Sequence, residues 1–286
     1  MSASRSEFVP VRGLRYHLRR WGDPAGRPLV LLHGWLDCAE TFAPMIEALP
    51  ARWQVIAPDL RGFGDSEWPQ DGYYFWDYVG DLDAIVRHYC LDQPFVLVGH
   101  SMGAQVASLY AGVRSECVSH LVCLDGLMLP DIPPQRVTSR ARQWLEELRE
   151  EPFDRVYESW SELASAVRRM HPRIDAERAR FVAHCWAREA RDGSIRLRSD
   201  PRHRRLSPVP YRVEESIAVW REVRAATLFV DGALSPLRKL IGEDEIARRR
   251  SAFRDHHVAS IAGAGHMLHL DAPAETAAAI AAFLPG

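Results

Sequence analysis

Four short apolar runs occur in the first 125 residues, at 29–33, 54–58, 95–99 and 121–125. None of them alternates polar with apolar positions, which is the pattern of strands that are covered on both faces. Between these runs, segments 77–90 and 104–113 carry apolar residues at helical spacing. This alternation of strand and helix predicts βαβ units and a mostly parallel sheet.

The alternation stops after Leu129, where prolines follow at 130, 133 and 134. Helical spacing, with many tryptophans and arginines, then covers 138–149, 155–170 and 175–190, before a turn at Gly193. Strands are expected again at 226–231 and 257–261, and a last helix at 274–283. We therefore expect a core formed by residues 1–129 and 213–286, interrupted by a helical cap of residues 130–212.

Composition narrows the class of protein but does not identify an activity. The 286 residues are 47% hydrophobic and 26% charged, which is ordinary for a globular chain. A net charge of −2 argues against nucleic acid as a partner. No apolar run approaches the roughly 20 residues of a membrane span, so no membrane association is expected. No pattern in the sequence indicates an oligomeric state.

The cysteines and the first residues bear on the compartment. The five cysteines are odd in number and lack CxxC spacing, so neither a disulfide framework nor a zinc site is expected. Residues 1–7 have no apolar stretch after their charge, so no signal peptide is expected. The sequence thus favours a reduced, cytoplasmic protein.

One motif points directly to nucleophilic catalysis. Residues 99–103 read Gly-His-Ser-Met-Gly, which matches G-x-S-x-G, and they lie between a predicted strand and a predicted helix. Glycines permit the tight turn that exposes Ser101, and the helix N-terminus beneath it favours negative charge. The backbone N–H groups of Trp35, in the turn after the first apolar run, and of Met102 are the predicted oxyanion hole.

A histidine near the C-terminus is the predicted general base. His266 follows the last predicted strand in a glycine-rich loop, from which its imidazole could reach the serine. His269 is the rival, but it lies closer to the following helix and is expected to be structural. An acid should lie between Ser101 and His266 in the chain.

These motifs, taken together, resemble the α/β-hydrolase fold superfamily over nearly the whole chain. The resemblance rests on segments 32–35, 59–66, 99–103 and 263–266, which read LHGW, DLRGFGDS, GHSMG and GAGH. It implies a mostly parallel eight-stranded sheet flanked by helices, with the cap inserted between strands 6 and 7. It also implies a serine-nucleophile, esterase-like enzyme, and a structural role for Asp59 and Arg61.

The acid departs from the superfamily's commonest pattern. Many members carry it in the loop after the strand that follows the cap, where this chain has Ser235. Asp125 ends the strand after the nucleophile helix, a position that some members use, and it is the favoured acid. Asp231 ends the later strand and is the alternative. A turn or capping role before Gly126 is the other interpretation of Asp125.

The predicted chemistry is carboxylesterase action on a small to medium apolar or aromatic ester, through an acyl-enzyme on Ser101. It needs no cofactor and no metal, and its partner is a small-molecule substrate. The serine argues against the related epoxide hydrolases and haloalkane dehalogenases, which use an aspartate at that position. A C–C bond hydrolase or a cofactor-independent dioxygenase on the same scaffold is one alternative. A small-molecule receptor with vestigial hydrolysis is another.

Aromatic residues suggest where a substrate could lie. The expected pocket residues are His100, Trp35, Trp160 and Trp186. The aromatic stretch 73–78 is expected either to pack in the core or to form a pocket wall. The arginine runs at 202–205 and 248–250 are expected to be solvated faces, with anion binding as the alternative.

Overall fold

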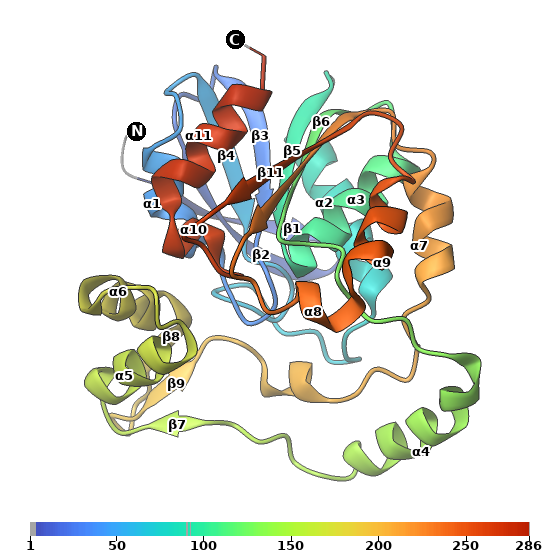
Figure 1. The fold of residues 1–286 in the computed structure, drawn as a ribbon. Helices are drawn as coiled ribbons and strands as arrows, with labels where there is room; N and C mark the ends of the chain where they lie inside the picture. Colours follow the sequence, from blue (N-terminus) through green and yellow to red (C-terminus); the bar gives the residue numbers. More distant parts are fainter. Residues whose placement is uncertain (1–3, 90, 92, 286) are drawn as a thin grey trace.

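A computed structural model describes residues 4–89, 91 and 93–285 of the chain. Its centre is an eight-stranded sheet (Figure 1). In spatial order the strands are β1 (Arg5–Val11), β2 (Leu14–Trp21), β4 (Trp53–Pro58), β3 (Arg27–Leu32), β5 (Phe95–His100), β6 (Val118–Leu124), β10 (Ala226–Gly232) and β11 (His256–Ile261). The strands from β4 to β11 are parallel, whereas β1 and β2 pair antiparallel, so the predicted mostly parallel eight-stranded sheet is confirmed.

Helices cover both faces of this sheet, as the unbroken apolar runs require. On one face lie η1 (Ala39–Phe42), α1 (Ala43–Glu47), α10 (Leu268–Asp271) and α11 (Pro273–Phe283). On the other lie α2 (Phe75–His88), α3 (Met102–Val113) and α7 (Val213–Trp220). Successive residues of β3 point to opposite faces: Leu31 packs with the first group of helices and Leu32 with the second.

The two antiparallel strands, β1 and β2, were not located by the apolar runs. They form a hairpin whose turn holds Arg12 at φ 46° and Gly13 at φ 86°. Two successive positive φ angles match the right-handed twist of the flanking strands, which is why such turns favour glycine. The end of β1 alternates buried and exposed residues, and the buried stretch of β2 includes the polar His17, so neither strand forms a continuous apolar run.

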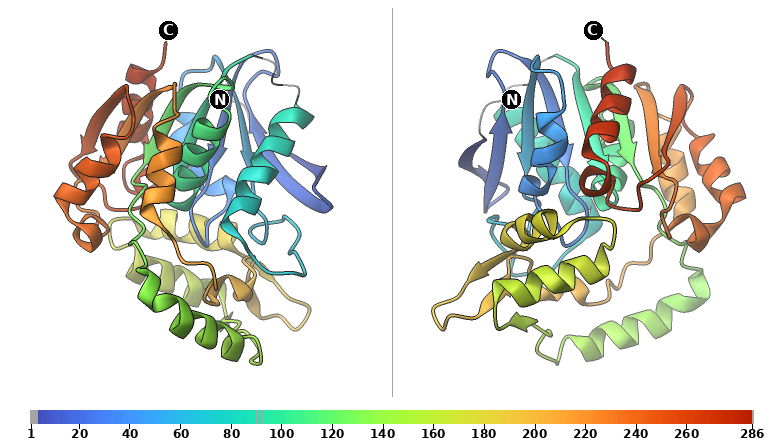
Figure 2. Two further views of the ribbon diagram at one scale, coloured as in Figure 1. Left: turned by 90° about the vertical axis from the view of Figure 1, so that its right-hand side faces the viewer. Right: turned by 60° about the vertical axis from the view of Figure 1, so that its left-hand side comes forward.

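Residues 130–212, between β6 and α7, form the cap segment. The cap segment lies across one end of the sheet, opposite both termini (Figures 1 and 2). It contains α4 (Val137–Glu147), α5 (Trp160–Met170) and α6 (Ala176–Trp186), together with η2 (Pro134–Arg136) and η3 (Pro201–Arg204). It also contains a small antiparallel sheet of β7 (Val156–Tyr157), β9 (Ile195–Leu197) and β8 (Ala187–Glu189). The sequence suggested a purely helical cap, but the segment also contains this sheet. The division of the chain into a core of residues 1–129 and 213–286 and a cap of residues 130–212 stays a prediction.

Two expected helices of this segment are shorter than the spacing suggested. The helix expected over 155–170 begins only after Ser159, whose side chain accepts the backbone N–H of Glu162, while Glu162 accepts the N–H of Glu158. This reciprocal capping fixes the first turn and leaves residues 156–157 free to pair as a strand. The helix expected over 175–190 ends at Trp186 because residues 187–189 pair with β9. The C-terminal end of the helix expected over 77–90 falls on Cys90, outside the described residues.

The remaining helices, α8 (Arg238–Ile241) and α9 (Glu243–Arg250), follow β10. The arginine run at 248–250 was expected to be solvated, but Arg249 of α9 is only 2% exposed. Its guanidinium donates to the carbonyl oxygens of Leu127 and Leu129 and pairs with Glu245. These acceptors for Nε and Nη1 offset the cost of burying the charge. Among the described residues, no helix combines the length and apolarity needed to cross a membrane.

Candidate active site

Ser101 occupies a sharp turn between β5 and α3. Its backbone adopts φ 52° and ψ −113°, an unusual conformation for a residue with a side chain. A Cβ on Gly99 would lie 2.3 Å from the carbonyl oxygen of Gly103, and one on Gly103 would lie 2.3 Å from that of Leu32. Both glycines of the motif are thus required sterically, and the turn leaves Ser101 partly exposed at the end of the sheet that the cap segment covers.

Asp125 directly follows β6 and contacts the predicted base. Its Oδ2 lies 2.7 Å from Nδ1 of His266 and accepts the hydroxyl of Ser235 at 2.6 Å, while its Oδ1 accepts the N–H of Gly232 at 3.2 Å. The carboxyl group is fully buried. Three donors therefore fix its orientation towards the imidazole. Ser235, which stands where the commonest family pattern has the acid, orients the acid that occupies the other position.

Asp231, the alternative acid, is engaged elsewhere. Its Oδ2 lies 2.5 Å from Arg238, and its Oδ1 lies 2.6 Å from Arg250. Both arginines follow Asp231 in the sequence and pair with it near the end of β10. A carboxylate held by two guanidiniums is already charge-compensated, so this geometry favours Asp125 as the partner of His266.

The two predicted oxyanion donors lie on either side of the serine. Met102 is the first residue of α3, so its N–H has no acceptor within the helix. Trp35 lies in the turn after β3, and a Cβ on the adjacent Gly34 would come within 3.3 Å of the Ser101 Cβ. In the described part of the chain neither N–H donates to another backbone group. Likewise, no hydrogen bond joins Ser101 to His266; such contacts commonly tighten when substrate binds.

Asp37, His100 and His269 form a buried polar cluster close to these residues. Asp37 accepts the indole N–H of Trp186 at 2.8 Å and lies 3.3 Å from His269, and His100 donates to the carbonyl oxygen of His266 at 2.8 Å. Donor atoms of Asp37, His100 and His269 all lie within 4.8 Å of one another, so these three could hold a metal ion. The cluster joins the turn of the oxyanion loop, the serine turn and the histidine loop through side chains with almost no solvent exposure.

Electrostatics set the charges within this cluster. Burial alone would raise the pKa of Asp37, but His269, His33 and the indole N–H of Trp186 hold it below its usual range. For His100, burial together with His269 and His266 lowers the pKa well below its usual value. The cluster therefore contains an ionised carboxylate and a neutral His100 at neutral pH. The rival histidine of the sequence, His269, is buried as a partner of Asp37 and lies outside solvent reach.

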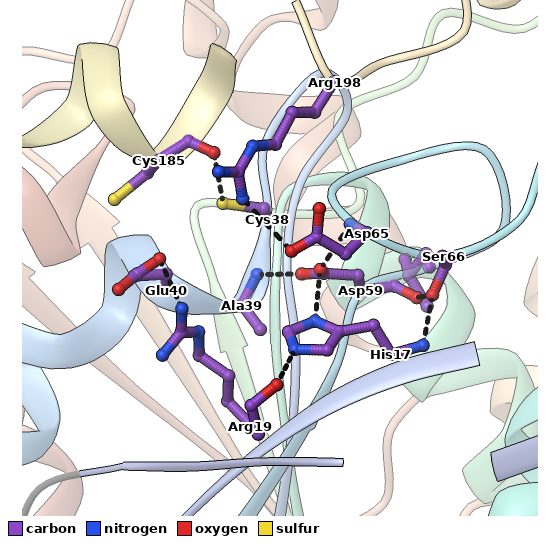
Figure 3. Close-up of polar contacts among 12 residues, drawn as sticks. His17, Arg19, Cys38, Ala39, Glu40, Asp59, Asp65, Ser66, Cys185 and Arg198 are labelled. Atoms are coloured by element: carbon purple, nitrogen blue, oxygen red, sulfur yellow. Dashed lines mark hydrogen bonds and ion pairs between the residues drawn. The ribbon is translucent and has the colours of Figure 1, made fainter. Parts of the chain in front are cut away.

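A second set of metal-type donors, His17, Asp59 and Asp65, lies where β2 meets the loop after β4 (Figure 3). Nδ1 of His17 lies 2.7 Å from Asp59, and the other oxygen of Asp59 accepts the N–H of Ala39 at 2.8 Å. Asp65 in turn pairs with Arg198 of the cap segment at 3.2 Å. The Asp59 carboxylate therefore connects β2 with the first residue of η1, which agrees with the expected structural role.

A cavity of about 780 Å³ lies between the core and the cap segment. The aromatic stretch predicted as either core or pocket wall lines it, through Tyr73, Tyr74, Phe75, Trp76 and Tyr78. Met102 and Gln105 of α3 also line it, so the cavity extends along the helix that follows Ser101; the Ser101 side chain itself is not part of the lining. Aromatic walls with a few polar groups are typical of small-molecule sites.

The four predicted pocket residues do not line this cavity. Trp186 donates to buried Asp37, Trp160 stacks on His184 at 4.1 Å between ring centroids, and His100 is buried behind the serine. Trp35 is 50% exposed and lies outside the lining. The cap tryptophan that lines the cavity is instead Trp144 of α4. The assignment of His100, Trp35, Trp160 and Trp186 to a substrate pocket stays a prediction, because spacing does not reveal which side of a small cap faces inward.

The arginine run at 202–205 was expected to be a solvated face, and the structure differs here too. Arg202 pairs with Asp200 at 2.6 Å and donates to two loop carbonyl oxygens. His203 stacks between Phe63 and Tyr73, at 3.8 and 3.6 Å between ring centroids. Of the four residues only Arg204 is exposed. The run therefore attaches the cap segment to the core beside the cavity.

Buried and partly buried histidines predict that the free energy of unfolding depends on pH. Burial lowers the pKa of His33, His100, His171 and His203, the last to about 3. Below about pH 6.5 the unfolded chain binds protons at these positions that the folded chain does not, so the free energy of unfolding falls as pH falls. Each histidine contributes a slope of up to about 1.4 kcal/mol per pH unit. Denaturant titrations at pH 7.5, 6 and 5 measure this.

A matched variant isolates one of these groups. His203→Phe keeps a ring between Phe63 and Tyr73 but removes the titrating nitrogen. Its stability is expected to fall less steeply between pH 6.5 and 5 than that of the wild type. Depressed carboxyl pKa values, such as that of Asp37, act only below about pH 4 and do not interfere in this window. Stability that stays constant or rises on acidification to pH 5 would contradict the prediction.

Comparisons with known proteins agree with this fold. A family model described as the alpha/beta hydrolase fold matches residues 27–273. The chain is 26% identical over 298 residues to a serine hydrolase-like protein of Danio rerio, covering 99% of this chain and 90% of that one. It is 25% identical over 279 residues to the 2-(acetamidomethylene)succinate hydrolase of Mesorhizobium japonicum, covering 98% and 95%. Among solved structures, the thioesterase domain from the curacin biosynthetic pathway superposes with a TM-score of 0.87 at 23% identity, covering 98% and 99%.

The chain belongs to the α/β hydrolase fold family. This confirms the resemblance inferred from the four motifs, and it confirms the fold class. It makes the protein an α/β hydrolase.

Proposed function

We propose that this protein is a serine hydrolase that cleaves carboxylic esters through an acyl-enzyme on Ser101. One observation carries the proposal: the buried Asp125 holds Nδ1 of His266 at 2.7 Å, beside a serine in a strained turn. A partly exposed serine, a carboxylate and an imidazole, in this chain order, form the arrangement that activates a hydroxyl for attack on an acyl carbon.

The steps follow from the chemistry of each group. Ser101 Oγ attacks the ester carbon while Nε2 of His266 takes the hydroxyl proton, and the imidazolium then gives that proton to the leaving alcohol. Asp125 holds the Nδ1–H tautomer and stabilises the imidazolium. The N–H groups of Trp35 and Met102 receive the developing oxyanion. A water molecule, activated by His266 in the same way, releases the acid and restores Ser101.

The cavity supports a small to medium apolar or aromatic substrate. Its volume of about 780 Å³ falls within the usual range for small-molecule pockets, and its core-side wall is aromatic. Since Met102 belongs both to the wall and to the proposed oxyanion hole, an ester whose carbonyl lies beside Met102 would extend into this cavity. A small-molecule substrate is thus the proposed partner.

Active-site labelling tests the nucleophile directly. A fluorophosphonate probe should add one phosphonyl group to the wild-type protein, and peptide mass spectrometry should locate it on Ser101. Ser101→Ala should remain unlabelled, and Ser139→Ala, which changes an exposed serine of α4, should label like the wild type. An unlabelled wild-type protein with native circular dichroism, or a label on another residue, would overturn the proposal.

A further inference from the structure

The cap side of the cavity carries an excess of arginine. Four arginines line the cavity, Arg140, Arg202, Arg205 and Arg212, against two carboxylates, Asp71 and Glu215. Both carboxylates belong to exposed residues, and neither forms an ion pair with these arginines in the described part of the chain. Within this lining the arginines, all from the cap segment, therefore outnumber the carboxylates.

Two of the four arginines are already paired. Arg202 lies 2.6 Å from Asp200, whose carboxyl group is almost fully buried, and its other donors reach loop carbonyl oxygens. Arg212 lies 3.7 Å from Asp131. Their charges are compensated by the protein, so neither needs a ligand.

Arg140 and Arg205 differ from that pair, because no carboxylate in the described residues lies within ion-pair distance of either. Arg140 Nε donates to the carbonyl oxygen of Ser207 at 2.6 Å, and Arg205 donates one N–H to that of Glu150 at 2.6 Å. The Nε atom of Arg205 is buried with no hydrogen-bond partner. Both side chains are partly buried, and each keeps N–H groups that are not used by the protein.

The surroundings of Arg140 reinforce this contrast. The nearest acidic group on the same helix, Glu147, already accepts the N–H of Leu206 at 2.6 Å and the amide of Gln143 at 2.7 Å. Burial and the neighbouring Arg136 lower the pKa of Arg140 by more than the charge of Glu147 raises it, so Glu147 does not compensate the guanidinium fully. A guanidinium that is partly desolvated without a counter-ion is stabilised when an anion binds.

We infer that the substrate carries an anionic group, which Arg140 and Arg205 bind at the cap end of the cavity while its apolar or aromatic part lies against the aromatic wall. The inference rests on the proposed function, since the ester carbonyl is taken to lie beside Met102. A carboxylate or a phosphate group offers the oxygens that guanidinium donors match, often in pairs. An acyl chain ending in a carboxylate and a leaving group bearing a phosphate are the two possible sources of that anion.

Matched esters test the anionic group. 4-Nitrophenyl valerate and mono(4-nitrophenyl) glutarate share a leaving group and an acyl chain length, but only the second ends in a carboxylate. We expect kcat/KM to be about tenfold higher for the glutarate ester, near the lower end of the effect of a hydrogen bond to a charged group. Butyryl-coenzyme A, compared with the neutral thioester S-butyryl-N-acetylcysteamine, tests instead for a phosphate on the leaving group.

Three variants assign the effect to residues. Arg140→Gln and Arg205→Gln should each lower kcat/KM for the preferred anionic substrate about tenfold and leave valerate within about twofold of the wild type. Arg142→Gln removes an exposed charge from the same helix outside the cavity and should change neither substrate. Equal kcat/KM for the neutral and anionic members of both pairs, or equal losses on both members in the variants, would overturn the inference.

The outcomes also separate this inference from the proposed function. If the two arginine variants lose kcat/KM for the glutarate ester alone, the anion is a carboxylate on the acyl chain. If they lose kcat/KM for butyryl-coenzyme A alone, the anion is a phosphate on the leaving group. Either result supports the anion site. Hydrolysis of the valerate ester with labelling of Ser101, but without any anion preference, would leave the proposed function intact and reject the site. Failure of labelling would reject the proposed function before the substrate comparison is made.

Discussion

Replacement of Ser101 by alanine is expected to lower kcat for 4-nitrophenyl ester hydrolysis by a factor on the order of 10⁴–10⁶. The acyl-enzyme cannot form without Oγ, and only binding and the oxyanion donors then remain to accelerate attack by water. The turn itself should survive, since alanine and serine place the same Cβ at a backbone φ of 52°. Steady-state assays with the esters described above, together with thermal unfolding curves, measure both quantities.

The same variant separates the alternative chemistries on this scaffold. Ser139→Ala controls for the loss of a serine hydroxyl, since that residue is exposed on α4, outside the cavity lining. Retention of most turnover in Ser101→Ala, accompanied by oxygen consumption, would favour a cofactor-independent dioxygenase. Tight ligand binding with negligible turnover by the wild type across esters would favour a receptor. Either outcome would contradict an acyl-enzyme on Ser101.

The fold was largely predictable because its central strands are buried on both faces. Strands such as β5 contain only buried residues, so their sequence is continuously apolar and differs from that of any exposed element. The β1–β2 hairpin lies at an exposed edge and has no such run, and its best signal was the turn at Gly13. The small sheet of the cap segment has strands of two or three residues, too short to produce any periodicity.

The candidate site was predictable only in its local parts. The serine turn is a property of consecutive residues, because Gly99 and Gly103 make the turn sterically possible. The pocket was not predictable, because the side of the cap that faces inward depends on how α4 and the loop after η3 pack against the core. Arg205 is an example: its sequence neighbours suggest a solvated run, whereas its Nε atom is buried.

The choice of acid shows what tertiary contacts add. From the sequence, Asp125 and Asp231 each end a strand near the predicted base, and only their positions in the chain distinguish them. In the structure, Ser235 and Gly232 orient Asp125 towards His266, whereas Asp231 is held by arginines. The contacts of Asp125 join residues more than 100 positions apart, so no local pattern could reveal them.

The Asp125→Asn variant is expected to lower kcat by about 10⁴-fold, because an amide neither fixes the Nδ1–H tautomer of His266 nor stabilises its cation. Asp231→Asn should keep kcat within a few-fold of the wild type. It should instead lose about 1.5–3 kcal/mol of stability, because Arg238 and Arg250 lose their charged acceptor.

The two aspartates form a matched pair for this experiment, since both are buried and both follow or end a central strand. Ester kinetics at saturating substrate and thermal unfolding of each variant distinguish loss of catalysis from loss of structure. A large fall in kcat for Asp231→Asn with a native unfolding curve, alongside an active Asp125→Asn, would transfer the role of the acid to Asp231. Because Asp125, and not Asp231, is hydrogen-bonded to the imidazole, the catalytic loss should follow Asp125 and the stability loss should follow Asp231.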